Sequence, residues 1–354
     1  MLGSIEITMK ECTQTAKPAA DASGLHYNFV FFFAHDDFWK AILGEEIYEC
    51  ENVRVYEGAF DGSELLKKLF HCHWAYSVNR KVCLPLKSIW FRRMYRQDFK
   101  NDLPLCFVYM GSNSIRYDGG FCDYVRRASK ENRQVVLCQD LIGKKTEYDY
   151  SLIRDKMDLC ITYDKEEAKR YGIQYFQETT FSKLIPEPER AEFEQDVYFL
   201  GAAKDRLPKI LSVHRVLTEA GLKCKFLIAG VPKEQQVEGE GIVYTTGIPY
   251  KENLENVVRS KCVLELIQGD SVDITTRALE AIAYRRRLIT DCQICDPAYF
   301  NEGQLLIISN PETIDPAFVR AELDPEAYPP RLDLNPLKRL YFIQEQLEKQ
   351  DAER

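Results

Sequence analysis

The feature that most restricts the fold is an alternation of short apolar segments with amphipathic helical stretches, which occurs twice along the chain. In the first half, the apolar segments have the length of buried strands and lie at 27–34, 53–56, 105–110, 134–138 and 159–162, with helical spacing at 62–76, 121–130 and 165–171. In the second half, strand-like segments lie at 196–200, 225–229, 242–245, 262–267, 288–290 and 305–308, with helical stretches at 207–220, 251–260 and 275–286. This alternation predicts two parallel, doubly wound α/β sheets in tandem.

The domain boundary is expected near residue 185, because residues 179–195 contain two prolines and a cluster of charged residues. The expected parts are a polar tail (1–24), a first domain (25–185), a second domain (186–330) and a final segment (331–354) with a helix over 335–349. With 354 residues, of which 45% are hydrophobic and 29% charged, the chain has enough apolar material for two cores.

Charge, cysteines and hydropathy restrict the partners and the compartment. The formal net charge is −8, so we expect no nucleic-acid partner. Residues 1–24 are polar and lack an apolar segment of signal-peptide length, and the longest apolar segments are far shorter than the roughly 20 residues that span a bilayer. The 12 cysteines are scattered, which is typical of a reducing compartment. We expect a soluble, cytoplasmic protein.

The most specific stretch of the sequence is 246–291. It contains, in order, a turn, a short helix, a Glu-Ala pair on a second helix, and a strand that ends in Thr-Asp. The residues concerned are Gly247, Pro249 and Tyr250 in the turn, Leu254 and Val258 in the helix, the pair Glu280 and Ala281, and the strand 288–291. This order resembles the carboxyl-terminal domain of the GT-B glycosyltransferases, whose two Rossmann-like doubly wound domains face a cleft. The resemblance implies that the second domain binds a nucleotide-sugar donor, that the first binds the acceptor, and that the final helix packs back on the first domain.

The start of the second helix in this stretch carries the chemistry that such a donor needs. The N–H groups and the dipole at a helix start attract phosphate. Thr275 and Thr276 add hydroxyl donors, and Arg277 can bind a diphosphate bidentately. Glu280, on the same helical face, can accept hydrogen bonds from a ribose diol. The competing interpretation is a capped surface helix on which Arg277 and Glu280 form an exposed ion pair. We favour the donor site, to which Tyr250 of the preceding turn also belongs.

A further donor-binding loop is expected after the strand 196–200. Gly201 allows a tight turn toward a phosphate, and Lys204 or Arg206 would neutralise its charge. The alternative is a turn with solvated charges. No second glycine follows in the dinucleotide-binding pattern, which disfavours a dehydrogenase.

The stereochemical course of the reaction depends on a second carboxylate. Retaining GT-B enzymes commonly carry two glutamates, of which the second corresponds to Glu280. The first would fall at Val272, which has no carboxylate, although Asp270 and Asp273 lie close by. An inverting route is therefore preferred.

An inverting route needs a general base from the first domain to deprotonate the acceptor hydroxyl. The candidates follow the first strand: Asp37 or Asp36 is preferred, and His35 is the alternative. One of the two aspartates can instead cap the next helix, which leaves the other free. Asp140, after another strand, is a weaker candidate.

Residues 85–100 mix basic and aromatic side chains in an acidic protein. Arg92, Arg93 and Arg96 are expected to bind an anionic acceptor, or the segment contacts a membrane surface through its charges and through aromatic anchors such as Trp90. The alternative is a solvated helix whose aromatic side chains belong to the core. A second basic cluster, 285–287, is expected to be the solvated end of a helix.

Neither metal nor cofactor is expected. The sequence His71-Cys72-His73 and the pair Cys292 and Cys295 lack a second pair of ligands nearby, and no Asp-x-Asp motif occurs. The sequence therefore predicts a metal-independent glycosyltransferase that moves a sugar from a nucleotide-diphosphate sugar to a saccharide or lipid-linked acceptor. The resemblance points to bacterial surface polysaccharide synthesis, and we expect peripheral contact at the inner face of the membrane through 85–100. The alternatives are a non-catalytic two-domain ligand-binding protein and a nucleotide-sugar epimerase of the same architecture.

Overall fold

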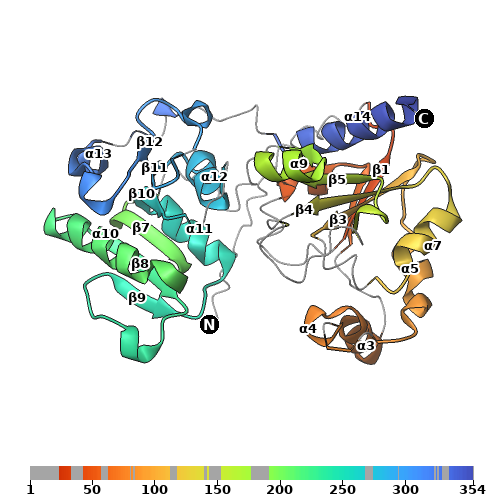
Figure 1. Cartoon of the computed structure of the whole chain (residues 1–354), viewed down its shortest axis with the longest axis horizontal. Coiled ribbons are helices and arrows are strands. Elements are labelled where there is room, and N and C mark those ends of the chain that lie inside the picture. The colour runs from red at the N-terminus through yellow and green to blue at the C-terminus, as the bar shows by residue number, and fades with distance from the viewer. Residues whose placement is uncertain are drawn as a thin grey trace, which may run out of the picture.

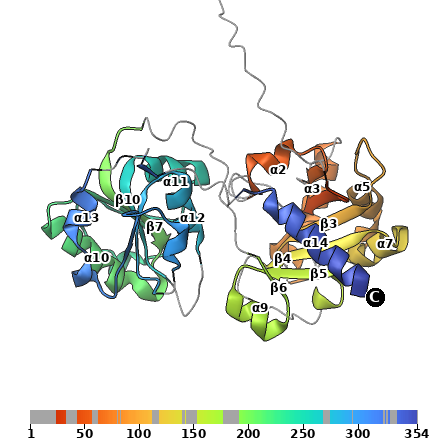
Figure 2. The ribbon, with the colours of Figure 1, turned by 90° about the horizontal axis from the view of Figure 1, so that it is seen from above.

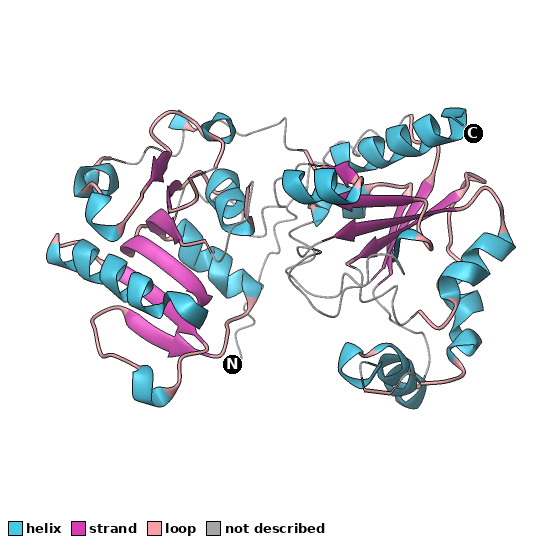
Figure 3. Cartoon of the chain, in the orientation of Figure 1, coloured by secondary structure: helices cyan, strands magenta, loops and turns pink. Residues whose placement is uncertain are grey.

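The structure is a computed structural model with two parallel six-stranded sheets, which form separate lobes (Figure 1). It describes residues 24–32, 43–56, 63–79, 81–82, 84–111, 118–138, 142, 153–176, 191–267, 274–293, 295–322, 324, 327–328 and 335–353. The predicted fold class is confirmed, since helices and strands alternate in both lobes (Figure 3). The predicted domain boundary near residue 185 lies outside the described residues.

The first sheet has the strand order β2-β1-β3-β4-β5-β6. Its strands are β1 (Asn28–Phe32), β2 (Val53–Tyr56), β3 (Leu105–Met110), β4 (Arg133–Cys138), β5 (Leu159–Thr162) and β6 (Gln174–Tyr175). The accompanying helices are α2 (Glu45–Glu49), α3 (Glu64–Trp74), α4 (Tyr76–Asn79), η1 (Lys87–Trp90), α5 (Phe91–Tyr95), α7 (Phe121–Ala128) and α9 (Lys165–Tyr171).

β1 shows why its residues form a central strand. Phe29 and Phe31 point into one core, and Val30 and Phe32 point into the core on the other side. Successive side chains of a strand alternate between the two faces of a sheet. Both faces are covered here, so the strand is apolar at successive positions, as is typical of parallel sheets.

The second sheet has the strand order β12-β11-β10-β7-β8-β9. Its strands are β7 (Gln195–Ala202), β8 (Cys224–Ala229), β9 (Ile242–Thr245), β10 (Ser260–Glu265), β11 (Arg287–Thr290) and β12 (Leu305–Ile307). The helices are η3 (Lys204–Arg206), α10 (Leu207–Glu219), η4 (Lys233–Gln235), α11 (Tyr250–Val258), α12 (Thr276–Ala283), η5 (Pro297–Tyr299), η6 (Pro311–Thr313) and α13 (Pro316–Arg320). From β7 the chain runs outward to β8 and β9, then returns to β10 on the other side of β7, so the strand order reverses between β7 and β10.

The last helix, α14 (Lys338–Glu353), follows the second sheet in sequence but packs on the first (Figure 2). Leu340, Ile343 and Leu347 lie in the same core as Phe29 and Phe31 of β1. The Gln344 side chain accepts from the His26 N–H at 2.6 Å and donates to the Gly24 carbonyl at 3.0 Å. These contacts connect the C-terminal helix to the start of the first sheet.

The arginine cluster 285–287 departs from the expectation of a solvated helix end. Arg286 and Arg287 are buried. The Arg286 guanidinium donates to the Val258 carbonyl at the end of α11, at 2.7 and 3.2 Å. Arg287 donates to carbonyl groups at the end of α13, including that of Ala321 at 2.8 Å. The last carbonyl groups of a helix lack intrahelical partners, so these two cations serve the second domain structurally.

Candidate functional site

A cavity of about 290 Å³ opens at the carboxyl ends of β7 and β10. Because the strand order reverses between these two strands, the cavity occupies the position at which open α/β sheets bind their ligands. The predicted donor residues among those that line it are Gly201, Arg206, Thr275, Thr276 and Arg277; the other lining residues are Phe199, Leu200, Leu264, Glu265, Leu266 and Ile267. Residues far apart in the sequence meet here because each follows or precedes the end of a strand in the same sheet.

The N-terminus of α12 forms one wall of the cavity. Thr275 is the N-cap, and its side-chain oxygen accepts from the N–H groups of Arg277 and Ala278 at 3.1 and 3.2 Å. The same hydroxyl donates to the Glu265 carboxylate, so Thr275 orders the helix start rather than offering a proton to a ligand. Thr276 is the first residue of the helix and is exposed. Its N–H and hydroxyl therefore lie at the positive end of the helix dipole.

Arg277 and Glu280 form an ion pair that is buried, which contradicts the alternative of an exposed surface pair. Glu280 is 1% exposed, and its Oε1 accepts from the Tyr250 hydroxyl at 2.9 Å and from Asn253 Nδ2 at 3.0 Å. Arg277 also donates to Asn253 Oδ1 at 3.1 Å and to the Leu200 carbonyl at 3.0 Å. Both carboxylate oxygens of Glu280 are thus engaged by the protein. Of this group, Arg277 lines the cavity. Tyr250 and Glu280 do not line it; Glu280 pairs with Arg277, and Tyr250 donates to Glu280.

Burial and the Glu280 carboxylate together shift the pKa values of Arg277 and Tyr250. Burial works against the charge of Arg277, but the Glu280 carboxylate and the neighbouring acidic groups outweigh it, so the pKa of Arg277 is raised. Burial, followed by the negative charge of Glu280, raises the pKa of Tyr250 well above its ordinary value. Arg277 therefore stays cationic at the cavity wall, and Tyr250 stays a neutral donor to Glu280.

Arg206 bridges the ends of the two strands beside the cavity. Its guanidinium donates to the Leu266 carbonyl after β10 and to the Ala202 carbonyl of β7, the latter at 2.7 Å. Burial lowers its pKa, and the nearby Asp291 opposes this shift. Its Nε is buried and has no hydrogen-bond partner among the described residues. Lys204 adopts a positive φ of 44° and is not among the residues that line the cavity.

Glu265 is a cavity residue that sequence reasoning missed. It ends β10, is 6% exposed, and accepts from the hydroxyls of Thr275 and Thr290. Burial raises its pKa, although the two hydroxyls and Arg277 act in the opposite direction. The available signal was a single carboxylate in the otherwise apolar segment 262–267, near the end of a strand where ligands of parallel sheets bind.

The remaining predicted site residues fall in two groups. His35, Asp36, Asp37, Asp140, Asp270 and Asp273 lie outside the described residues. Arg92, Arg93 and Arg96 are exposed at and just after α5, on the first sheet's lobe. Trp90 and Phe91 are 4% and 5% exposed and belong to the core. This confirms, for Trp90 and Phe91, the alternative in which the aromatic side chains belong to the core, where they hold η1 and α5 against the sheet, and it excludes these two as membrane anchors.

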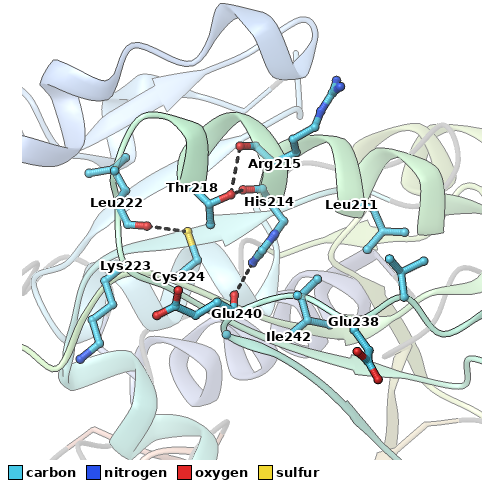
Figure 4. A pocket seen from close by; sticks show the side chains of 14 residues that line it. Leu211, His214, Arg215, Thr218, Leu222, Lys223, Cys224, Glu238, Glu240 and Ile242 are labelled. Atoms are coloured by element: carbon cyan, nitrogen blue, oxygen red, sulfur yellow. Dashed lines mark hydrogen bonds between the residues drawn. The ribbon is translucent and has the colours of Figure 1, made fainter.

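A larger cavity of about 800 Å³ lies at the opposite edge of the second sheet, between α10 and the starts of β8 and β9 (Figure 4). His214 contacts the Glu240 carbonyl at 2.9 Å there, and Arg215, Thr218 and Lys223 also line it. None of the predicted donor residues lines this cavity. This cavity lies at the amino ends of the strands, whereas ligands of parallel sheets bind at the carboxyl ends.

Metal binding and membrane crossing can be assessed for the described part of the chain. Within it, no group of three or more His, Cys, Asp or Glu side chains is placed to hold a metal ion. Within the same residues, no helix combines the length and the apolar character that crossing a bilayer requires.

Comparison with known proteins gives structural similarity without sequence similarity. No family model and no curated protein matches the chain. An alpha-glucosyltransferase (AGT) in complex with UDP matches with a TM-score of 0.44 at 9% identity, over 74% of this chain and 79% of that one. Spinosyn forosaminyltransferase SpnP gives 0.37 at 13% identity over 92% and 95%, and the glycosyltransferase SnogD from Streptomyces nogalater gives 0.39 at 11% over 90% and 99%. At this level of similarity, the residues of the site must carry the functional argument.

Proposed function

We propose that the protein is a glycosyltransferase that uses a nucleotide-diphosphate sugar as donor. The observation that carries the proposal is the cavity at the β7/β10 reversal, which combines Gly201, the N-terminus of α12 and two arginines. The helix dipole and guanidinium groups favour a diphosphate.

The transfer itself follows an inverting course in this proposal. The acceptor hydroxyl oxygen attacks the anomeric carbon, and its proton passes to Asp37 or Asp36, with His35 as the alternative base. The bond between the anomeric carbon and the diphosphate oxygen breaks as the new glycosidic bond forms. The departing diphosphate is stabilised without a metal by α12, Arg206 and Arg277.

The acceptor side of the proposal concerns the first domain, over 25–185. An anionic saccharide or lipid-linked acceptor would bind Arg92, Arg93 and Arg96, with the segment 85–100 at the inner face of a membrane. The second domain, over 186–330, would bind the donor, and the biological role would be surface polysaccharide synthesis in the cytoplasm of a bacterium. The exposure of all three arginines supports an interaction with an anionic partner.

The test is a thermal-shift titration of the full chain with UDP-, GDP-, ADP- and CMP-sugars, followed by assay of sugar transfer and of donor epimerisation. Thr276→Glu is the decisive variant. An acidic residue in the first turn stabilises a helix by about 0.3–1 kcal/mol, but here it repels the diphosphate. We expect wild-type protein to be stabilised by one class of donor, and the variant to bind it at least tenfold more weakly.

The matched control is Ala317→Glu, which adds the same charge to the first turn of α13 at an exposed position outside the cavity. It should bind the donor like wild type. An absence of any nucleotide-dependent shift in the wild type would refute the donor site. Binding without chemistry would instead identify a non-catalytic binding protein, and conversion of the donor sugar alone would identify an epimerase.

A further inference from the structure

One face of α3 is apolar and exposed. Leu65, Leu66 and Leu69 are exposed, and Leu65 reaches 76%. Phe70 attaches the helix to the lobe, because its ring contacts the Trp90 ring at 5.5 Å between centroids. The leucine spacing is typical of a core-facing helix, but the buried residue of α3 is Phe70, and the three leucines stay exposed.

The segment after α3 adds more exposed aliphatic side chains. Val82, Leu86 and Ile89 are 62%, 71% and 57% exposed. They belong to the same part of the lobe, since Trp90 of η1 donates to His73 of α3 at 2.6 Å. Six of the nine exposed large hydrophobic residues in the described chain therefore lie between 65 and 89. We call these six residues, Leu65, Leu66, Leu69, Val82, Leu86 and Ile89, the aliphatic patch; Figure 3 shows α3 and α4 at the periphery of the lobe. Clustered exposure of this kind marks an interaction site.

The charge of this segment is opposite to that of the whole protein. Residues 63–96 contain eight Lys and Arg residues and a single acidic residue, Glu64, in a chain of net charge −8. Lys87 is buried, with its Nζ 5.2 Å from the Trp74 ring centre, and Lys67 pairs with Glu64 at 2.8 Å. The exposed basic residues include Lys68, Lys81, Arg92 and Arg96.

We propose that residues 63–96 dock on an anionic lipid bilayer, with the aliphatic patch inserted at the level of the headgroups and the exposed basic residues contacting lipid phosphates. An anionic bilayer matches both the aliphatic patch and the exposed basic residues, since it accepts aliphatic side chains and attracts Lys and Arg. Nucleic acid would match the charge and leave the leucines in water. A second copy would bring two basic faces together, which repel each other.

The inference rests on the proposed function only in that it extends the membrane contact of 85–100 to α3. It also differs from the contact through aromatic anchors that the sequence suggested. The inserted groups are the aliphatic side chains of α3 and of the segment that follows it, while Trp90 stays in the core. Lipid binding and donor binding are measured in separate assays, so either proposal can be refuted without the other.

The experiment is flotation of the full chain with vesicles of phosphatidylcholine alone, or of phosphatidylcholine mixed with phosphatidylglycerol. We expect binding to the mixed vesicles, little binding to the neutral ones, and a decrease as salt is added. The double variant Leu65→Ser/Leu69→Ser and the double variant Lys68→Glu/Lys81→Glu should each lose at least tenfold in affinity. All four positions are exposed, so the melting temperature and the nucleotide-sugar shift should stay at wild-type values.

The matched controls are Val243→Ser and Lys233→Glu, at exposed positions of the second sheet's lobe, and both should bind vesicles like wild type. Several results would overturn the proposal. These are absence of wild-type binding to the mixed vesicles, an equal loss in the controls, or a concentration-dependent dimer that the leucine variant abolishes. Binding to double-stranded DNA that competes with vesicles and survives the leucine substitutions would equally overturn it.

Discussion

Replacing Glu280 tests whether the ion pair with Arg277 is a structural support of the cavity wall. In Glu280→Gln, an amide replaces the carboxylate that faces the Arg277 guanidinium, the Tyr250 hydroxyl and Asn253 Nδ2. Glu280 is 1% exposed and the Arg277 side chain 17%. Breaking a buried pair on one side leaves an uncompensated charge and costs about 3–5 kcal/mol.

That cost is large against a typical domain stability of about 5–15 kcal/mol. For a domain of the size of the second lobe, it corresponds to a fall in melting temperature of roughly 6–20 °C. The assay is thermal and urea unfolding at neutral pH, with hydrogen exchange to assign the loss to α11 and α12. The control is Glu252→Gln, at an exposed position of α11, which should change stability by less than about 0.5 kcal/mol.

The double variant Arg277→Met/Glu280→Gln separates the pair from its context. Removing both charges should recover much of the stability lost in the single variant, because no buried charge remains unpaired. If Glu280→Gln unfolds like wild type and loses only donor binding, Glu280 is a ligand-binding group and the structural reading is refuted.

Two further predictions concern stability in the first lobe. Asp118 accepts from the Cys122 N–H and from Lys156, each at 2.9 Å; burial acts to raise its pKa, but these partners prevail and hold it below 3.8. A depressed carboxyl pKa stabilises the fold above the unfolded-state value and loses that contribution as the pH falls through the folded-state value. Asp118→Asn should therefore cost roughly 1–3 kcal/mol at neutral pH, and urea titrations should show the gap from wild type closing below pH 3.8; a gap that persists unchanged there would contradict the assignment. Leu340→Ala removes a fully buried contact of α14 with the first sheet and should cost about 2–5 kcal/mol, with hydrogen exchange accelerated in β1 and not in β7, whereas Glu353→Ala at the exposed end of the same helix should leave both unchanged.

Sequence reasoning succeeded where the physical signal is local. Strands such as Leu105–Met110 and Ile242–Thr245 have the predicted bounds, because a buried strand needs an apolar run between turn residues. It also predicted that Gly201 and Arg277 lie near each other, and both line the same cavity. In a parallel sheet, loops that follow neighbouring strands at the reversal of strand order meet at one edge.

The same reasoning failed where a side chain's role depends on its partner. Residues 251–260 were expected to be helical throughout, yet α11 ends at Val258, and Ser260 is buried at the start of β10, where Gln195 donates to it at 2.8 Å. Nothing in the local pattern reveals this partner, which lies 65 positions away. Glu265 escaped notice for a related reason, since Thr275 and Thr290 become its partners only when β10, β11 and α12 pack together.

The sequence by itself determined two parallel α/β sheets and the edge of the second at which a ligand would bind, because apolar periodicity and turn residues are properties of neighbouring positions. The tertiary structure alone decided which charges are buried and which apolar faces remain uncovered. Arg286 and Arg287 sit inside the protein because helix ends from elsewhere in the chain present carbonyl groups to them. Leu65 and Leu69 face solvent because the helix packs through Phe70 instead. Periodicity shows that a helix has an apolar face, but only packing shows whether the protein covers it.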